Sequence, residues 1–204
     1  MKRLFFAFLL LLPAAAGFGA PLTTLGAQNG DTSGGNYTAD ALRYAARTQL
    51  AFVISSDLRD FTSADEPSGE ELVSLIAIKS DKVYSMILTG EQIGKALKKA
   101  FFLYPRANPA FLHLSGMRVV LKDHGVKTVE VASGDGWEPL AGRVLYSVAM
   151  SQSLAEGVLG YWKLWSIEDA EEESMTMGDI IPLYFAEQDQ KDPFEKRITT
   201  EEDQ

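Results

Sequence analysis

Hydrophobic residues along the chain follow two periods, one typical of helices and one typical of strands. A helical period begins after Asn36, a residue suited to the N-cap position, and continues to Ala45. Unbroken apolar residues at Leu50–Ile54 predict a strand, and alternation at residues 83–88 predicts another. The first half of the chain is therefore expected to mix helices and strands.

Two capping boxes predict where further helices begin. Ser68 is followed three residues later by Glu71, in front of an apolar run. Thr89 and Gln92 repeat this spacing, and an apolar stripe at helical spacing follows them as far as Phe101. Both boxes predict a helix that starts immediately after the Ser or Thr.

The second half of the chain is rich in strand patterns. Residues 117–121 and 126–132 flank an Asp-His-Gly turn and predict a hairpin, and residues 143–150 predict another strand. A last helix is expected near Asp179, with Pro182 in its first turn. This alternation predicts an α/β fold, a mixed β-sheet with packed helices.

The N-terminus has the three-part layout of a signal peptide, which we expect to span residues 1–19. Lys2 and Arg3 precede nine apolar residues at 4–12, and small residues follow. Cleavage is expected between Ala16 and Gly19. We expect residues 20–35 to form a flexible lead-in, residues 36–187 the domain, and residues 188–204 a polar tail with a frayed end.

Composition limits the compartments and the classes of partner that we expect for this protein. The net charge of −9 disfavours binding to nucleic acid or to anionic lipid. The chain has no cysteine, which excludes disulfides and a lipid-modified cysteine. Together with the signal peptide, this predicts a periplasmic or secreted protein without a membrane anchor.

The residues available for catalysis are few. The chain has two histidines, His113 and His124, and we therefore expect no metal site and no cofactor. His113 stands in an apolar strand pattern and is expected to be structural. No serine lies in a G-x-S-x-G elbow, and the acidic run at 168–173 is expected to be a solvated loop.

Two aromatic runs, FFLYP at 101–105 and YWKLW at 161–165, allow two interpretations. Aromatic side chains at such spacing belong most simply to the core. An exposed aromatic ledge for a partner or a sugar is the alternative.

Five segments, in chain order, resemble motifs of the C-terminal domain of the 5'-nucleotidase family. They are residues 35–43 (GNYTADALR, like GNLxADAxR), 50–59 (like FxNxGGIR), 88–93 (LTGEQI, like LTGxxL), 111–118 (FLHLSGMR, like FLQVSGLR) and 148–161 (VAMSQSLAEGVLGY, like VATNDFLxxGGDGY). The resemblance implies the fold of that domain, which recognises the nucleotide beside a dimetal phosphatase domain.

The departures from the family motifs fall on its ligand-binding positions. Ile54 stands where the family has its asparagine, and Ser56 and Asp57 stand where it has paired glycines. Lys79 and Ser153 replace the two stacking phenylalanines, and Leu159 replaces the ribose-binding aspartate. No Lys or Arg between Arg3 and Arg43 matches the family arginines that hold phosphate. We expect the matching positions to be the remnant of a ligand site: Asp57, Arg59, Lys79, Asp81, Ser153 and Tyr161.

These observations lead to two hypotheses on function. The first is an exported, stand-alone relative of the recognition domain that is not an enzyme by itself and binds a partner or an altered ligand. The second is a specificity subunit that acts in trans with a separate metallophosphatase chain, in hydrolysis of nucleotides or sugar nucleotides.

Export generates the first testable prediction. Mass spectrometry of the protein recovered outside the cytoplasm should find an N-terminus near Gly17 or Ala20, because a signal peptidase cleaves after small residues. An intact Met1 on the exported protein would contradict the signal-peptide prediction.

Overall fold

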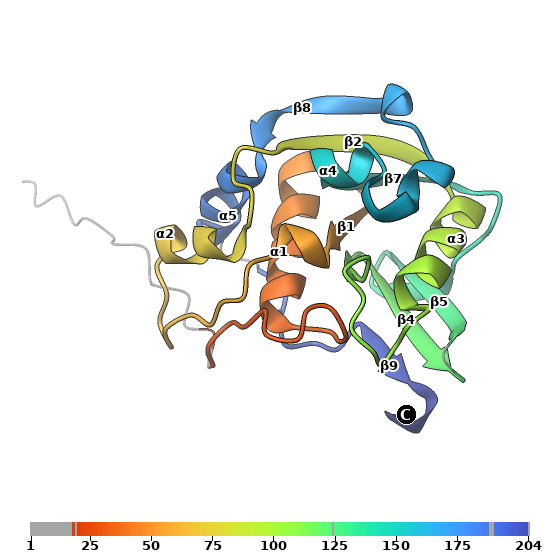
Figure 1. Ribbon diagram of the computed structural model, residues 1–204, viewed down its shortest axis with the longest axis horizontal. Coiled ribbons are helices and arrows are strands. Elements are labelled where there is room, and N and C mark those ends of the chain that lie inside the picture. Colours follow the sequence, from red (N-terminus) through yellow and green to blue (C-terminus); the bar gives the residue numbers. More distant parts are fainter. Residues whose placement is uncertain (1–17, 19, 124, 188–189, 204) are drawn as a thin grey trace, which may run out of the picture.

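The computed structural model describes residues 18, 20–123, 125–187 and 190–203 (Figure 1). The predicted signal peptide, apart from Phe18, and His124 lie outside the described residues. Within the described part of the chain, no helix is both long and apolar enough to cross a membrane.

A mixed five-stranded sheet forms the centre of the molecule. Its strand order is β3-β1-β7-β2-β8, and β1 runs parallel to β7 and antiparallel to β3. The strands are β1 (Leu50–Ile54), β2 (Lys82–Thr89), β3 (Leu112–Ser115), β7 (Leu145–Ser151) and β8 (Ala170–Thr176). The predicted mixed sheet with packed helices is confirmed.

Every residue of β1 is buried, because both faces of this strand are covered. Leu50, Phe52 and Ile54 point into one apolar cluster, whereas Ala51 and Val53 point into another. Since successive side chains of a strand point to opposite faces, the unbroken apolar run is what a strand between two cores requires.

Helices pack on both sides of this sheet (Figure 1). On the Ala51 side lie α1 (Ser33–Ala46), α2 (Gly69–Leu72) and α5 (Met177–Phe185). On the Phe52 side lie α3 (Gly90–Phe101) and α4 (Gln152–Ala155).

A second sheet of four strands, in the order β6-β5-β4-β9, also packs on the Phe52 side. Its strands are β4 (Met117–Lys122), β5 (Gly125–Ser133), β6 (Gly136–Pro139) and β9 (Ile198–Thr200). The antiparallel pairing of β4 with β5 confirms the predicted hairpin.

The capping residues decide where the helices begin. Thr89 and Gln92 form the predicted capping box of α3, and Ser68 caps α2 by accepting a hydrogen bond from the Glu71 N–H. The prediction of Asn36 as N-cap is wrong: Thr32 caps α1, and Asn36 lies inside the helix. Asn36 Nδ2 instead donates to the carbonyl oxygens of Pro193 and Glu195.

Two segments outside the predicted domain boundaries are part of the packed structure. Leu22 is buried and its N–H donates to Ser63 Oγ, so the expected flexible lead-in lies against the core. The expectation of a frayed polar tail is wrong for the described residues, because β9 pairs in parallel with β4.

Arg197 anchors the C-terminal segment through a buried ion pair. Its Nη1 and Nη2 donate to Asp40 Oδ1 and Oδ2 at 2.9 and 2.6 Å. Nη1 also donates to the Leu114 carbonyl at 2.6 Å. Asp40 accepts a further hydrogen bond from Ser115 Oγ, so helix α1, strand β3 and the C-terminal segment are joined at one point.

Two local predictions about the region from 168 to 185 differ from the structure. The acidic run at 168–173 was expected to be a loop, but most of it lies in β8, an edge strand paired with β2. Pairing with β2 overrides the low strand propensity of glutamate, whose side chains at 171 and 172 stay exposed. Helix α5 begins at Met177, so Pro182 lies beyond its first turn.

The buried ion pair predicts a large loss of stability in an Arg197→Ala variant. Removal of the guanidinium leaves the Asp40 carboxylate buried without its counterion, which costs about 3–5 kcal/mol. Urea unfolding measures this loss. As a control, Arg118→Ala removes an exposed partner of Glu130 and should change stability by less than about 1 kcal/mol. Equal effects of the two changes would contradict the anchoring role.

Candidate functional site

The loop after β1 carries the residues that match the family's ligand-binding loop. Ile54 ends the strand, and residues Ser55–Asp57 form a single 3-10 turn. Ser55 Oγ donates to the Pro109 carbonyl at 2.8 Å. The Asp57 carbonyl accepts a hydrogen bond from the Ala77 N–H at 2.8 Å. The loop is therefore tied to its neighbours on both sides.

The Asp57 side chain is buried and both carboxylate oxygens accept hydrogen bonds within the protein. Ser151 Oγ donates to Oδ2 at 2.6 Å, and Ser153 Oγ donates to Oδ1 at 2.8 Å. Ser151 ends β7 and caps α4, where its hydroxyl also accepts from the Leu154 N–H. The carboxylate thus links the loop after β1 to the junction of β7 and α4.

A second carboxylate, Asp81, lies close to this cluster. Burial raises the pKa of Asp57 to about 6, against the two serine hydroxyls that lower it, and the Asp81 charge raises it further. Burial also raises the pKa of Asp81, as does the Glu156 carboxylate, whereas the Ser153 N–H lowers it. The cluster is acidic, and an incoming phosphate would be repelled by it.

The structure brings only some of the six predicted site residues together. Asp57, Asp81 and Ser153 form the cluster just described. The Arg59 side chain is exposed and has no hydrogen bond or ion pair within the described residues. Lys79 is exposed as well, and its backbone carbonyl accepts from the Gly178 N–H at the start of α5.

Tyr161, the sixth predicted site residue, belongs to the core. Its side chain is fully buried, its hydroxyl donates to the Ala110 carbonyl at 2.7 Å, and its ring stacks on Trp165 at 5.2 Å. Burial raises the pKa of Tyr161. The core interpretation of the YWKLW run holds for these two rings, but Trp162 between them is 64% exposed.

Leu159 has an unusual backbone. It adopts the left-handed conformation with φ 54° and ψ 26°, between Gly157 and Gly160, which also have positive φ. A residue with a Cβ is disfavoured in this conformation, because the Cβ comes too close to the backbone. The backbone at this position has a conformation that favours glycine, although the residue is leucine.

His113 is a structural residue, as expected. It is completely buried, and its Nε2 lies 3.1 Å from the Ala27 carbonyl, so Nε2 carries the proton that is donated. Burial lowers the pKa of His113 to about 4. The ring packs so closely on α1 that a Cβ at Gly35 would lie 2.2 Å from Nδ1. In the part of the chain that the structure describes, no group of three or more His, Cys, Asp or Glu residues could hold a metal ion.

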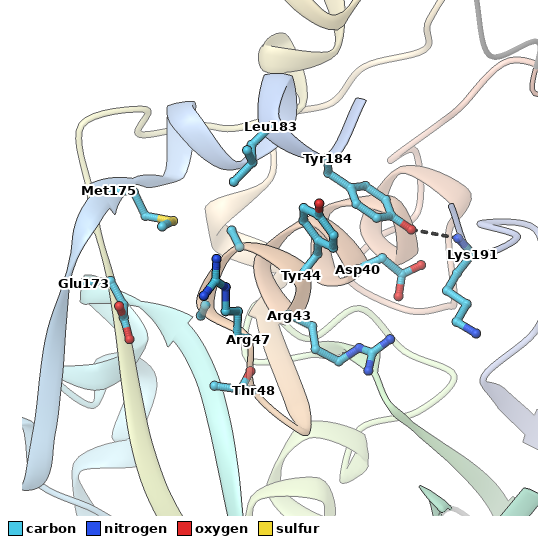
Figure 2. Close-up of a pocket in the computed structure, with 12 residues that line it drawn as sticks. Asp40, Arg43, Tyr44, Arg47, Thr48, Glu173, Met175, Leu183, Tyr184 and Lys191 are labelled. Carbon is cyan, nitrogen blue, oxygen red and sulfur yellow. Dashed lines mark hydrogen bonds between the residues drawn. The ribbon is translucent and has the colours of Figure 1, made fainter. Parts of the chain in front are cut away.

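A groove of about 710 Å³ lies apart from this cluster, between the end of α1, β8 and α5 (Figure 2). Figure 2 shows Arg47 on one side of Tyr44 and Arg43 and Lys191 on the other. Glu173 lines the groove too, and the Tyr44 hydroxyl donates to Glu187. Charges of both signs therefore line or adjoin this groove, which contains none of the six predicted site residues.

Ser151 is the cluster residue that sequence reasoning missed. Its position as an N-cap before the apolar residue Leu154 is a local signal, but nothing local indicates contact with Asp57, 94 residues away in the chain. Only the pairing of β1 with β7 brings the two side chains together.

The buried carboxylate predicts a specific pH dependence of stability. Folding raises the pKa of Asp57 from 3.8 to about 6, so its contribution is fully present below pH 3.8 and is lost as the pH rises through 6. Asp57→Asn removes the titration. The free energy of unfolding of this variant, minus that of the wild type, should rise by roughly 2–3 kcal/mol between pH 4 and pH 7. Asp60→Asn, an exposed change of the same charge, is the control. A difference that stays constant with pH would contradict the assignment.

Part of several solved nucleotidase structures has the same fold as this chain. The 5'-nucleotidase precursor of Thermus thermophilus superposes with a TM-score of 0.78 at 21% identity, over 89% of this chain and 38% of that chain. The NAD nucleotidase of Haemophilus influenzae gives 0.68 at 15% identity, over 83% and 33%. A putative 5'-nucleotidase of Staphylococcus aureus gives 0.64 at 9% identity, over 90% and 41%.

The present chain therefore spans between 33% and 41% of the length of these proteins. No curated protein matches the sequence. The family model of the 5'-nucleotidase C-terminal domain matches residues 15–164, which is most of the chain. With the fold and the motif order in agreement, the chain belongs to the 5'-nucleotidase C-terminal domain family.

Proposed function

We propose that the protein is a non-catalytic binding module, exported to the periplasm or secreted, that has lost the nucleotide site of its family. It acts by binding a protein partner or a ligand other than a nucleotide. A separate metallophosphatase chain and another exported protein are the two partner classes that the sequence suggests.

The observation that carries this proposal is that Asp57 is buried and hydrogen-bonded within the protein. The family has glycine at this position, where the backbone comes close to the ligand. Here a carboxylate occupies the position, and both of its oxygens are satisfied by Ser151 and Ser153. The buried Asp57 carboxylate repels a phosphate, and Ser153 takes the place of a stacking phenylalanine. The hydrogen-bonded pair of Asp57 and Ser153 therefore removes two of the family's ligand contacts.

The remaining positions support the same proposal. Leu159 has no acceptor for ribose hydroxyls, and Lys79 offers no aromatic face to a base. Both side chains are exposed, so the core does not require these residue types. The family model of the C-terminal domain matches residues 15–164, and the part of the chain that the structure describes holds no cluster of metal ligands.

The proposal predicts that AMP does not bind. Calorimetry should give no saturable heat up to about 1 mM AMP, because stacking on two aromatic rings, worth about 1–3 kcal/mol each, is missing. A variant that combines Asp57→Gly, Lys79→Phe, Ser153→Phe and Leu159→Asp should gain measurable AMP binding. Assays with Mn²⁺, Co²⁺ or Zn²⁺ should show no AMP hydrolysis by either protein.

Micromolar binding of AMP by the wild type, weakened by Arg59→Ala, would overturn the proposal. So would hydrolysis that stays with the protein through repurification. A thermal-shift comparison of the wild type and the combined variant serves as the folding control, because a variant that does not unfold cooperatively cannot test the site.

A further inference from the structure

The two aromatic runs are divided between the core and the surface. Phe101, Tyr161 and Trp165 are buried. Their neighbours Phe102 and Trp162 are 73% and 64% exposed, and Leu159 is 43% exposed. We call Phe102, Leu159 and Trp162 the apolar ledge. Phe102 and Leu159 line one groove, and large apolar side chains exposed together in this way are typical of interaction sites.

The ledge borders a groove at the end of α3. Phe102 and Leu159 line this groove of about 460 Å³, and Trp162 lies on the same short helical segment, Val158–Lys163, as Leu159. The other lining residues are Lys98, Lys99, Leu103, Asn108, Pro109 and Ala110. The groove and the segment are held together, because Lys99 Nζ lies 5.4 Å from the centre of the Tyr161 ring.

The backbone at Leu159 is held in a conformation that the leucine side chain disfavours. Its φ of 54° is suited to glycine, and glycines occupy the other two left-handed positions of this segment, 157 and 160. A strained residue in an exposed loop points to a role for its side chain beyond folding. Here the strain places an apolar side chain at the mouth of the groove.

The charged side chains that line the groove, Lys98 and Lys99, are both cationic, although the chain as a whole carries −9. None of the residues lining the groove is acidic. Lys98, Lys99 and Lys163 make no ion pair within the described residues, and Lys163 lies over the Trp162 ring at 5.3 Å. The last turn of α3 favours cations in any case, but it does not account for Lys163 or for the exposed rings.

We propose that the apolar ledge and its three lysines form a docking surface for an acidic segment of a protein partner that carries apolar side chains. The apolar side chains enter the groove beside Phe102 and Leu159, and the carboxylates pair with the lysines. This inference rests on the proposed function, since it names the kind of partner that the module binds.

Two other occupants fit the surface less well. A sugar needs several hydrogen-bonding groups, but both ends of the Asn108 amide are already used, by the Ala100 carbonyl and the Ala110 N–H. An anionic membrane would attract the lysines but repel a chain of charge −9. An acidic peptide segment matches both the apolar and the charged part of the ledge.

Selection from a random dodecapeptide phage library on the folded protein tests the proposal. Enriched peptides should combine Asp or Glu with aromatic or aliphatic residues. A synthetic peptide of the enriched sequence should bind in fluorescence polarisation, and its affinity should fall with added salt because Lys98 and Lys163 are exposed.

Three variants locate the binding. Phe102→Ala with Trp162→Ala, and Lys98→Gln with Lys99→Gln, should each weaken the peptide by about tenfold or more, since a few central residues carry most of the affinity of an interface. Leu159→Gly should weaken it too, yet leave the unfolding temperature unchanged or raised, because glycine is unstrained at that φ. The matched control is Leu145→Ala with Arg143→Gln, an exposed apolar and cationic pair on another part of the surface, which should have no effect.

Several results would overturn the docking surface. These are no enrichment, enriched peptides without acidic residues, or binding that the ledge variants leave intact. Binding to phosphatidylglycerol vesicles, lost in the lysine variant and without any peptide selected, would assign the ledge to membranes instead. None of these results bears on the AMP experiment, so failure of the docking surface and failure of the proposed function are distinguishable.

Discussion

The buried pair of Asp40 and Arg197 is the constraint on which the arrangement of the chain depends. Burial of either charge alone would cost several kcal/mol, so the ion pair favours the arrangement in which the C-terminal segment lies against α1 and β3. Asp31 reinforces this position, since its carboxylate accepts from the backbone N–H groups of Arg197 and Ile198. The two ends of the domain are thereby joined, and β9 is placed beside β4.

The Asp57 cluster makes the loop after β1 part of the packed structure. A loop built to approach a ligand needs free N–H groups and small residues. In this chain the Asp57 carboxylate occupies the loop and accepts hydrogen bonds from Ser151 at the end of β7 and from Ser153 in α4. The hydroxyls of Ser151 and Ser153 donate to this carboxylate and so link the loop after β1 to the junction of β7 and α4. Asp57 therefore makes a structural contact at a position where the resemblance implies a ligand contact.

The fold and the site change independently because they depend on different residues. Of the positions that match the family's ligand contacts, only Ile54 and Tyr161 belong to the two apolar clusters on either side of the central sheet. The family fold therefore persists at 21% identity or less in the superposed structures, while exposed positions such as Lys79 and Leu159 are free to vary. Fold likeness supports a shared scaffold, and function has to be argued from the site.

Local patterns were sufficient for the features that depend on neighbouring residues. Capping of α3 by Thr89 and Gln92, the extent of β1 and the hairpin of β4 and β5 follow from spacing, because each is satisfied within a few residues. The structural role of His113 was also predicted from its apolar context, whereas burial of Tyr161 and Trp165 was one of two interpretations that the sequence left open. The motif order was enough to predict the family.

Long-range contacts decided the rest. Arg197 stands in a polar, charged stretch, and nothing near it in the chain indicates that its partner is Asp40, 157 residues earlier. The glutamates of β8 have low strand propensity, and β8 forms because it pairs with the edge of β2. The apolar stripe of α3 includes Phe101, but only the fold determines that the adjacent Phe102 is exposed. In each case the free energy comes from a group distant in sequence, whose position exists only after the sheet has formed.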